Sequence, residues 1–175
     1  MKEILFHVCC GPCGTASLKK LSEEGYVVTG YYYNPNIQPN YEYKKRLKEA
    51  RGLFKKMALP LVIERYQPAE YFKAVKGSEN NKEERCINCW RLRLEKTAQK
   101  ANDLGIKNFG TTLRISPYQN QKELKKIALE VAAKYNLKFY LPELVDCFQE
   151  SIELSKEANM YRQKYCGCIF SKSYN

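Results

Sequence analysis

Short apolar runs alternate with longer amphipathic segments along the whole chain. The apolar runs predict strands at residues 3–8, 27–33, 61–63, 107–113 and 138–141. Apolar residues at helical spacing predict helices over 15–24, 41–58, 68–76, 87–103, 119–135 and 150–159. Strands that alternate with helices indicate an α/β fold, a mostly parallel sheet with helices on both faces. In such sheets the ligand binds beyond the carboxyl ends of the strands.

The length and composition fit one folded unit. We expect a single α/β domain over residues 1–175 that ends in a Cys-Gly-Cys tail, because 175 residues suffice for one hydrophobic core. The longest apolar runs are too short to cross a bilayer, and no secretion signal is evident. The sequence therefore predicts a cytoplasmic protein without a membrane partner.

The chain is strongly basic. Its 30 lysines and arginines exceed its 19 acidic residues and give a formal net charge of +11. An excess of this size favours polyanionic partners such as nucleic acid, although a lysine-rich surface alone produces the same balance. Fourteen tyrosines are available to stack on bases, but most will fill the core and surface.

The cysteines are clustered. Seven of the eight fall into three short groups, which in a reducing compartment favours metal binding or redox catalysis over disulfides. The groups are Cys9, Cys10 and Cys13; Cys86 and Cys89; and Cys166 and Cys168. Cys147 stands alone, and we expect it to be a small core residue.

The first group allows two interpretations. Cys10-Gly11-Pro12-Cys13 lies between a strand and a helix, as in a thioredoxin-like thiol–disulfide oxidoreductase, where the helix N-terminus lowers the thiol pKa. Such an enzyme would need neither Cys9 nor the second group. The same thiolates could instead bind a metal.

Two metals suit these thiolates. Zinc could take Cys10, Cys13, Cys86 and Cys89, which would make the protein a zinc-bound RNA-binding module. An iron–sulfur cluster can be approached by several chain segments, and we predict Cys9, Cys10, Cys86 and Cys89 as its ligands. Cys13 would then remain beside the cluster.

Two further features concern the tail and the single histidine. Cys166-Gly167-Cys168 is a dithiol whose glycine permits a tight turn, so its disulfide would be strained and easily reduced; two buried thiols are the alternative. His7 shares a strand face with Cys9, and we expect a hydrogen-bonded strand histidine there rather than a proton donor.

Several separated motifs together resemble one family. They are H-x-C-C-x-P-C, Y-N-P-N-I with Glu42-Tyr43 and Arg46, R-C-x-x-C with Leu92-Arg93-Leu94, T-T-L-x-I-S-P, S-I-E-L-S-K, and Y-R-Q-x-Y-C-G-C-x-F-S. In this order they resemble the epoxyqueuosine reductase QueH family over residues 4–171.

The resemblance implies a fold, an activity and a cofactor. The fold would be similar to the adenine-nucleotide alpha-hydrolase-like (HUP-like) layer. The reaction would be removal of the epoxide oxygen from epoxyqueuosine in tRNA, with a [4Fe-4S] cluster, an electron donor and no cobalamin. Cys9, Cys10, Cys86 and Cys89 would bind the cluster, and Cys166 and Cys168 would be the redox-active pair.

The chemistry suggests further roles. Loss of the epoxide oxygen as water takes two electrons, which a dithiol yields when it closes a disulfide. We hypothesise that Cys13, with Asp146 or another nearby carboxylate, holds an additional mononuclear iron that polarises the epoxide. Full iron content and activity in Cys13→Ala would reject this hypothesis.

Two segments are candidate substrate contacts. The basic stretch that contains Lys44, Lys45 and Arg46 is predicted to contact tRNA phosphates. In the loop after the second strand, Tyr33, Asn34 and Asn36 are predicted to stack on and hydrogen-bond to a flipped-out base.

Overall fold

The computed structural model describes residues 1–172, so the last three residues of the predicted 1–175 domain lie outside it. Five strands form one sheet in which every neighbouring pair is parallel, in the order β3-β2-β1-β4-β5. The strands are β1 (Lys2–His7), β2 (Tyr26–Tyr32), β3 (Leu61–Ile63), β4 (Asn108–Thr111) and β5 (Lys138–Phe139). The predicted α/β class with a parallel sheet is confirmed.

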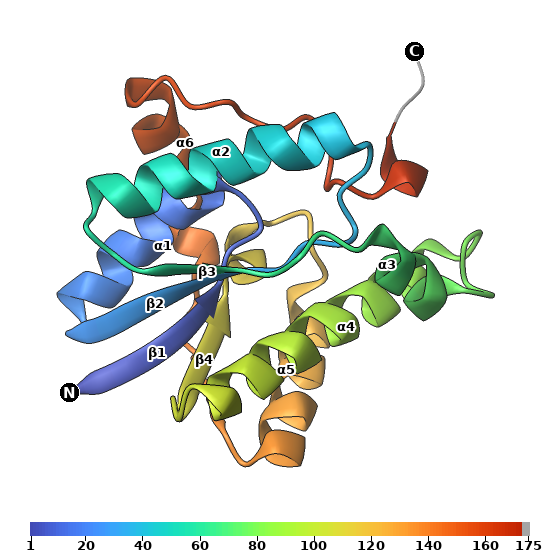
Figure 1. Ribbon diagram of the computed structural model, residues 1–175, viewed down its shortest axis with the longest axis horizontal. Helices are drawn as coiled ribbons and strands as arrows, with labels where there is room; N and C mark the ends of the chain where they lie inside the picture. The colour runs from blue at the N-terminus through green and yellow to red at the C-terminus, as the bar shows by residue number, and fades with distance from the viewer. Residues whose placement is uncertain (173–175) are drawn as a thin grey trace.

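Helices cover both faces of the sheet (Figure 1). One face carries α1 (Gly11–Glu23), α2 (Asn40–Lys56) and α6 (Phe148–Glu157), and the other carries α4 (Lys82–Asp103) and α5 (Gln121–Tyr135), with α3 (Pro68–Val75) against α4. Strand alternation divides the core accordingly: Leu5 joins the apolar cluster under α4 and α5, and Ile4 and Phe6 join the cluster under α1 and α2.

The order in which the chain adds strands to the sheet reverses at β1. From β1 it passes through α1 to β2 on one side, whereas β4 lies on the other side of β1 and continues to β5. In a sheet of this kind the crevice between two such strands is where ligands bind. Cys9 follows β1, and Thr112, the first residue of the 3₁₀ helix η1 (Thr112–Ile115), follows β4. Both residues therefore lie at this crevice.

The helix that carries the second cysteine pair begins five residues before its predicted start at residue 87. The side chain of Asn81 caps α4 by accepting a hydrogen bond from the backbone N–H of Glu84, and acidic residues occupy the first turn. Cys86 and Cys89 consequently lie inside α4 rather than at its beginning. Their backbone N–H groups are used by the helix and cannot form an anion site.

The C-terminal segment returns across the molecule. After α6 it runs past the N-terminal end of α2 and ends in the short 3₁₀ helix η3 (Ile169–Ser171), red in Figure 1. The other 3₁₀ helix, η2 (Val145–Cys147), precedes α6, and Cys147 packs partly buried against the apolar core there. No helix within residues 1–172 combines the length and apolarity needed to cross a membrane.

Candidate metal and redox site

Three thiols meet at the end of β1. The sulfur atoms of Cys9, Cys10 and Cys13 all lie within 4.8 Å of one another. Cys10 is the N-cap of α1, and its Sγ accepts a hydrogen bond from the backbone N–H of Cys13 at 3.4 Å. At the start of η1, the hydroxyl of Thr112 donates to the Cys9 sulfur at 3.2 Å and accepts from the Cys9 backbone N–H at 3.0 Å. The strand end and the helix cap thus hold the three sulfurs together.

The three thiols do not ionise equally. Hydrogen bonding with the thiols of Cys10 and Cys13, and then with Thr112, lowers the pKa of Cys9 well below its ordinary value. Burial raises the pKa of Cys10, and hydrogen bonding with Cys10 raises that of Cys13. The group therefore favours one thiolate, at Cys9. A compact set of sulfur donors, one ionised, suits a soft metal ion or an iron–sulfur cluster.

The geometry disfavours a thioredoxin-like role for Cys10 and Cys13. The attacking thiol of such an enzyme must be an accessible thiolate. Cys10 is 0% exposed, and burial raises its pKa. The structure therefore supports a metal site over the dithiol alternative.

Cys86 and Cys89 lie on α4, outside the compact thiol group, and Cys89 packs with Cys168 of the tail. Burial raises the pKa of both thiols, and each also interacts electrostatically with Cys168. The Nε of Arg93, one turn after Cys89, donates to the Cys89 carbonyl, while Arg93 lines the same cavity as Cys9. Of the four predicted cluster ligands only Cys9 lines the cavity, and the ligand set stays a prediction.

A cavity of about 520 Å³ opens over the thiol group. Cys9 and Cys13 lie in its wall, and Arg93, Arg162 and Lys164 are among its cationic residues. No aspartate or glutamate of residues 1–172 lines it. Its volume falls within the range of small-molecule sites, and its charge favours an anionic or neutral ligand.

Asp146, proposed above as a partner of Cys13, is exposed on η2. Within residues 1–172 no carboxylate joins Cys13 in the compact ligand group. The additional iron at Cys13 therefore stays a prediction.

His7 is a hydrogen-bonded strand residue, as predicted. It is fully buried, and its Nε2 lies 3.0 Å from the carbonyl of Tyr33, which can only accept, so Nε2 carries the proton. Nδ1 then accepts from the hydroxyl of Thr111 at 2.9 Å. Both nitrogens of the neutral ring are satisfied. Burial, followed by the charge of Arg93, lowers the pKa of His7 to about 4.

The lowered pKa of His7 predicts that the folded protein loses stability in mild acid. Between pH 6.5 and pH 5 the unfolded chain takes up a proton at His7 and the folded chain does not. The free energy of unfolding should therefore fall by about 1.5 kcal/mol over that interval, because the unfolded histidine is already half protonated at pH 6.5. Urea titrations of the wild type and of His7→Gln at both pH values measure it. The variant should lose this slope, and an equal slope in both proteins would contradict the assignment.

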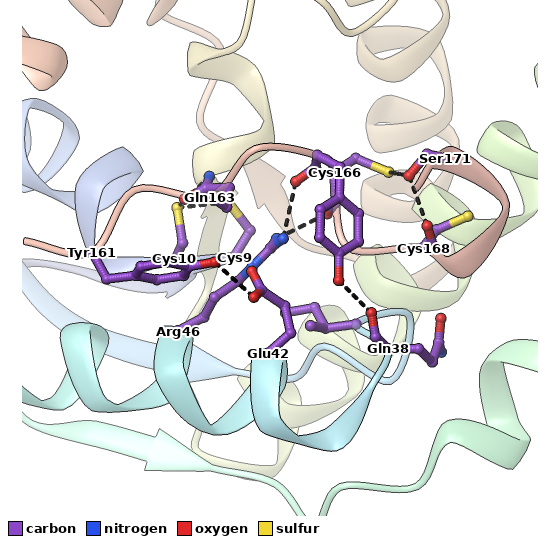
Figure 2. A network of polar contacts seen from close by, with 12 residues as sticks. Cys9, Cys10, Gln38, Glu42, Arg46, Tyr161, Gln163, Cys166, Cys168 and Ser171 are labelled. Carbon is purple, nitrogen blue, oxygen red and sulfur yellow. Dashed lines mark hydrogen bonds and ion pairs between the residues drawn. The ribbon is translucent and has the colours of Figure 1, made fainter. Parts of the chain in front are cut away.

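A buried ion pair attaches the C-terminal segment to α2 (Figure 2). Glu42 and Arg46 are 3% and 2% exposed and join at 2.7 Å. The two terminal nitrogens of Arg46 donate to the carbonyls of Tyr165 and Cys166 at 2.9 and 3.1 Å. The hydroxyl of Tyr161 donates to the second oxygen of Glu42 at 2.7 Å. The pair thus positions the backbone that carries the tail dithiol.

Gly167 is required where it stands. Its φ of +115° is unfavourable for other residues, and a Cβ there would approach Ile37 Cγ1 to 2.9 Å. Its carbonyl accepts from the backbone N–H of Gln38 at 2.8 Å, and the Gln38 side chain accepts from Ile169 N–H. Hydrogen bonds from the loop after β2 therefore fix the position of the turn between the two tail cysteines.

The two tail cysteines are not joined by a disulfide in the structure, and they differ in environment. Cys168 is buried, and Cys166 is exposed and lines the cavity. The hydroxyl of Tyr71 donates to the Cys168 sulfur at 2.9 Å. Hydrogen bonding with Cys166, and then with Tyr71, lowers the pKa of Cys168. The dithiol is thus arranged with one thiol disposed to ionise.

Gln163 connects the tail to the thiol group. Its side-chain N–H₂ lies 3.0 Å from the Cys10 sulfur and 3.7 Å from the Cys13 sulfur (Figure 2). Sequence reasoning missed both this residue and Thr112, because an amide and a hydroxyl have no metal-ligand spacing. Only the family motifs that contain them, Y-R-Q and T-T-L, could have indicated that these two residues belong to the site.

The predicted substrate residues are distributed differently. Tyr33, Asn34 and Asn36 are buried and do not line the cavity, and Tyr33 donates its hydroxyl proton to Glu70. The side-chain oxygens of Asn34 and Asn36 have no hydrogen-bond partner among residues 1–172. Direct base contact by this loop stays a prediction.

The basic stretch on α2 divides in two. Lys44 and Lys45 are exposed, as a phosphate contact requires. Arg46 is buried and its guanidinium is occupied by Glu42 and the tail. The structure gives Arg46 a structural role, and its contact with a phosphate stays a prediction.

Fold and site together define an α/β protein with a compact cysteine group, able to hold a metal, at the carboxyl edge of a parallel sheet. The family model for epoxyqueuosine reductase QueH matches residues 4–174. An epoxyqueuosine reductase QueH of Dehalococcoides mccartyi is 36% identical over 171 residues, covering 97% of this chain and 92% of that protein. The Thermotoga maritima protein of the same name is 35% identical over 98% of this chain and 91% of its own length.

The chain belongs to the epoxyqueuosine reductase QueH family and is an oxidoreductase. A solved structure described as a predicted subunit of tRNA methyltransferase from Methanocaldococcus jannaschii has a similar fold. Its TM-score is 0.61 at 15% identity, over 90% of this chain and 75% of that one. This likeness concerns the fold alone.

Proposed function

We propose that the chain reduces epoxyqueuosine to queuosine in tRNA, with a [4Fe-4S] cluster bound by Cys9, Cys10, Cys86 and Cys89. The observation that carries this proposal is the compact thiol group in the wall of a cationic cavity. Family membership supplies the reaction. When bound, such a cluster would transfer electrons one at a time.

The tail dithiol would supply the two electrons and two protons that the reaction needs. Closing the Cys166–Cys168 disulfide releases two electrons and two protons. The epoxide takes up both, its two C–O bonds break, the oxygen leaves as water, and a carbon–carbon double bond remains. The exposure of Cys166 in the cavity wall supports this role. An external electron donor must then reopen the disulfide.

Neighbouring polar groups would support negative charge on the sulfurs. Thr112 donates to Cys9, and the Gln163 amide lies against Cys10. Hydrogen bonds to the sulfurs of a metal centre stabilise its reduced form. Arg93 adds a positive charge in the cavity wall.

The positive charge of the chain suits a tRNA substrate. The exposed Lys44 and Lys45 on α2 and the cationic residues of the cavity are available for phosphates. The cavity would receive the modified nucleoside itself, because a reaction on a base requires that base to leave the stack.

The test is nucleoside analysis after reaction. Protein purified without oxygen and reduced with dithionite is incubated with tRNA that carries epoxyqueuosine. Digestion and mass spectrometry should show a nucleoside lighter by one oxygen. An unchanged nucleoside with iron-replete protein would overturn the proposal. Iron-free protein serves as the control and should leave the nucleoside unchanged.

A further inference from the structure

An exposed aromatic pair stands at the rim of the cavity. Tyr118, in the turn between η1 and α5, is 86% exposed, more than any other aromatic side chain of residues 1–172. Its ring meets Phe148, the first residue of α6, edge to face at 5.9 Å between centroids and 85° between planes. Both residues line the cavity. An aromatic ring left mostly in water at the edge of a binding site contributes little to folding and is available to a ligand.

Unpaired positive charges lie on the same cavity. Arg162 and Lys164, both exposed, project from the C-terminal segment, and neither forms an ion pair with a carboxylate of residues 1–172. As noted above, no described carboxylate lines the cavity to oppose them. Aromatic rings beside a positively charged groove are the combination that binds single-stranded nucleic acid.

We propose that Tyr118 and Phe148 form a stacking platform for a nucleobase next to the one that enters the cavity, and that Arg162 and Lys164 contact the flanking phosphates. This inference rests on the proposed function, which supplies the RNA. It places an RNA contact at the cavity rim, apart from the loop that contains Tyr33. The buried loop side chains cannot stack without rearrangement, whereas Tyr118 can do so as it stands.

The test is binding of fluorescently labelled tRNA, followed by anisotropy, to iron-loaded protein. Tyr118→Ala should weaken the affinity about tenfold, the effect of removing one stacked base, and Tyr118→Trp should keep it within about threefold. Phe72→Ala is the matched control, because Phe72 is also exposed, at 42%, and also meets a neighbouring ring edge to face, but does not line the cavity. Its affinity should stay at the wild-type value.

The salt dependence of tRNA affinity distinguishes base stacking from phosphate contacts. Tyr118→Ala should leave the slope of log affinity against log salt unchanged, whereas Arg162→Gln/Lys164→Gln should make it shallower by about 1.4. Unchanged affinity in Tyr118→Ala would overturn the inference. So would a loss confined to electron transfer from a protein donor, which would indicate a protein-docking surface.

Failure of this inference can be told from failure of the proposed function. Wild-type protein that deoxygenates the nucleoside while Tyr118→Ala keeps full tRNA affinity contradicts only the platform. Wild-type protein that neither binds tRNA nor changes the nucleoside contradicts both. The melting temperature of Tyr118→Ala should match the wild type, because the side chain is almost fully exposed.

Discussion

Cys10→Ser will lose most of the iron bound by the protein, and its reductase activity will fall by more than about 100-fold. A serine hydroxyl is a poor ligand for a metal that thiolates bind well, and it replaces the most buried sulfur of the group. Serine is also a good N-cap, so α1 keeps its first hydrogen bond and the fold should survive. Iron analysis and nucleoside analysis on protein purified without oxygen measure the two losses.

Cys147→Ser is the matched control. Cys147 is a partly buried cysteine on η2, outside the compact thiol group. The control should keep the iron content and activity of the wild type. If Cys10→Ser retains both as well, Cys10 is not a ligand and the assigned centre is wrong.

Arg46→Ala will lower the free energy of unfolding by about 3 to 5 kcal/mol. Removing the guanidinium leaves the buried carboxylate of Glu42 without its cation, and two carbonyls of the C-terminal segment lose their donors. Urea unfolding of iron-free wild type and variant measures the loss. The released tail should also expose Cys168, so alkylation of that thiol should become faster.

Two further variants define the origin of the effect. Lys45→Ala removes an exposed cation from the adjacent position and should change stability by less than about 0.5 kcal/mol. Arg46→Lys keeps a charge for Glu42 but cannot reach both tail carbonyls, so it should restore part of the stability while the tail stays reactive. A loss below about 1 kcal/mol in Arg46→Ala would show that the pair does not hold the tail.

Much of the fold can be predicted from the apolar pattern because strands and helices bury their apolar faces at characteristic periods. The strand Leu61–Ile63 has the predicted bounds, and the others differ at their ends. The start of α4 differs most, because its first turn is polar and is stabilised by the Asn81 cap rather than by burial. Apolar periodicity cannot detect a helical turn that buries little apolar surface.

The site is predictable only where spacing reveals chemistry. Cysteine spacing places Cys9, Cys10 and Cys13 together, which follows from one tight turn. It cannot place Gln163 against Cys10, a contact across 153 residues that depends on the path of the tail. The structural role of Arg46 is hidden for a similar reason: on its helix it belongs to a basic run, and the carbonyls that it contacts lie on the returning tail. Glu42, four residues before it, was the available signal of a helical ion pair.

The unequal exposure of the two tail cysteines sets an order for the regeneration of the enzyme under the proposed function. A reductant that approaches from solvent can reach the sulfur of Cys166, whereas Cys168 is covered. The incoming thiol would therefore form its mixed disulfide at Cys166 and expel Cys168. Tyr71 donates to the departing sulfur, and a thiol of lowered pKa is the better leaving group. Reduction of the tail disulfide would therefore begin at Cys166.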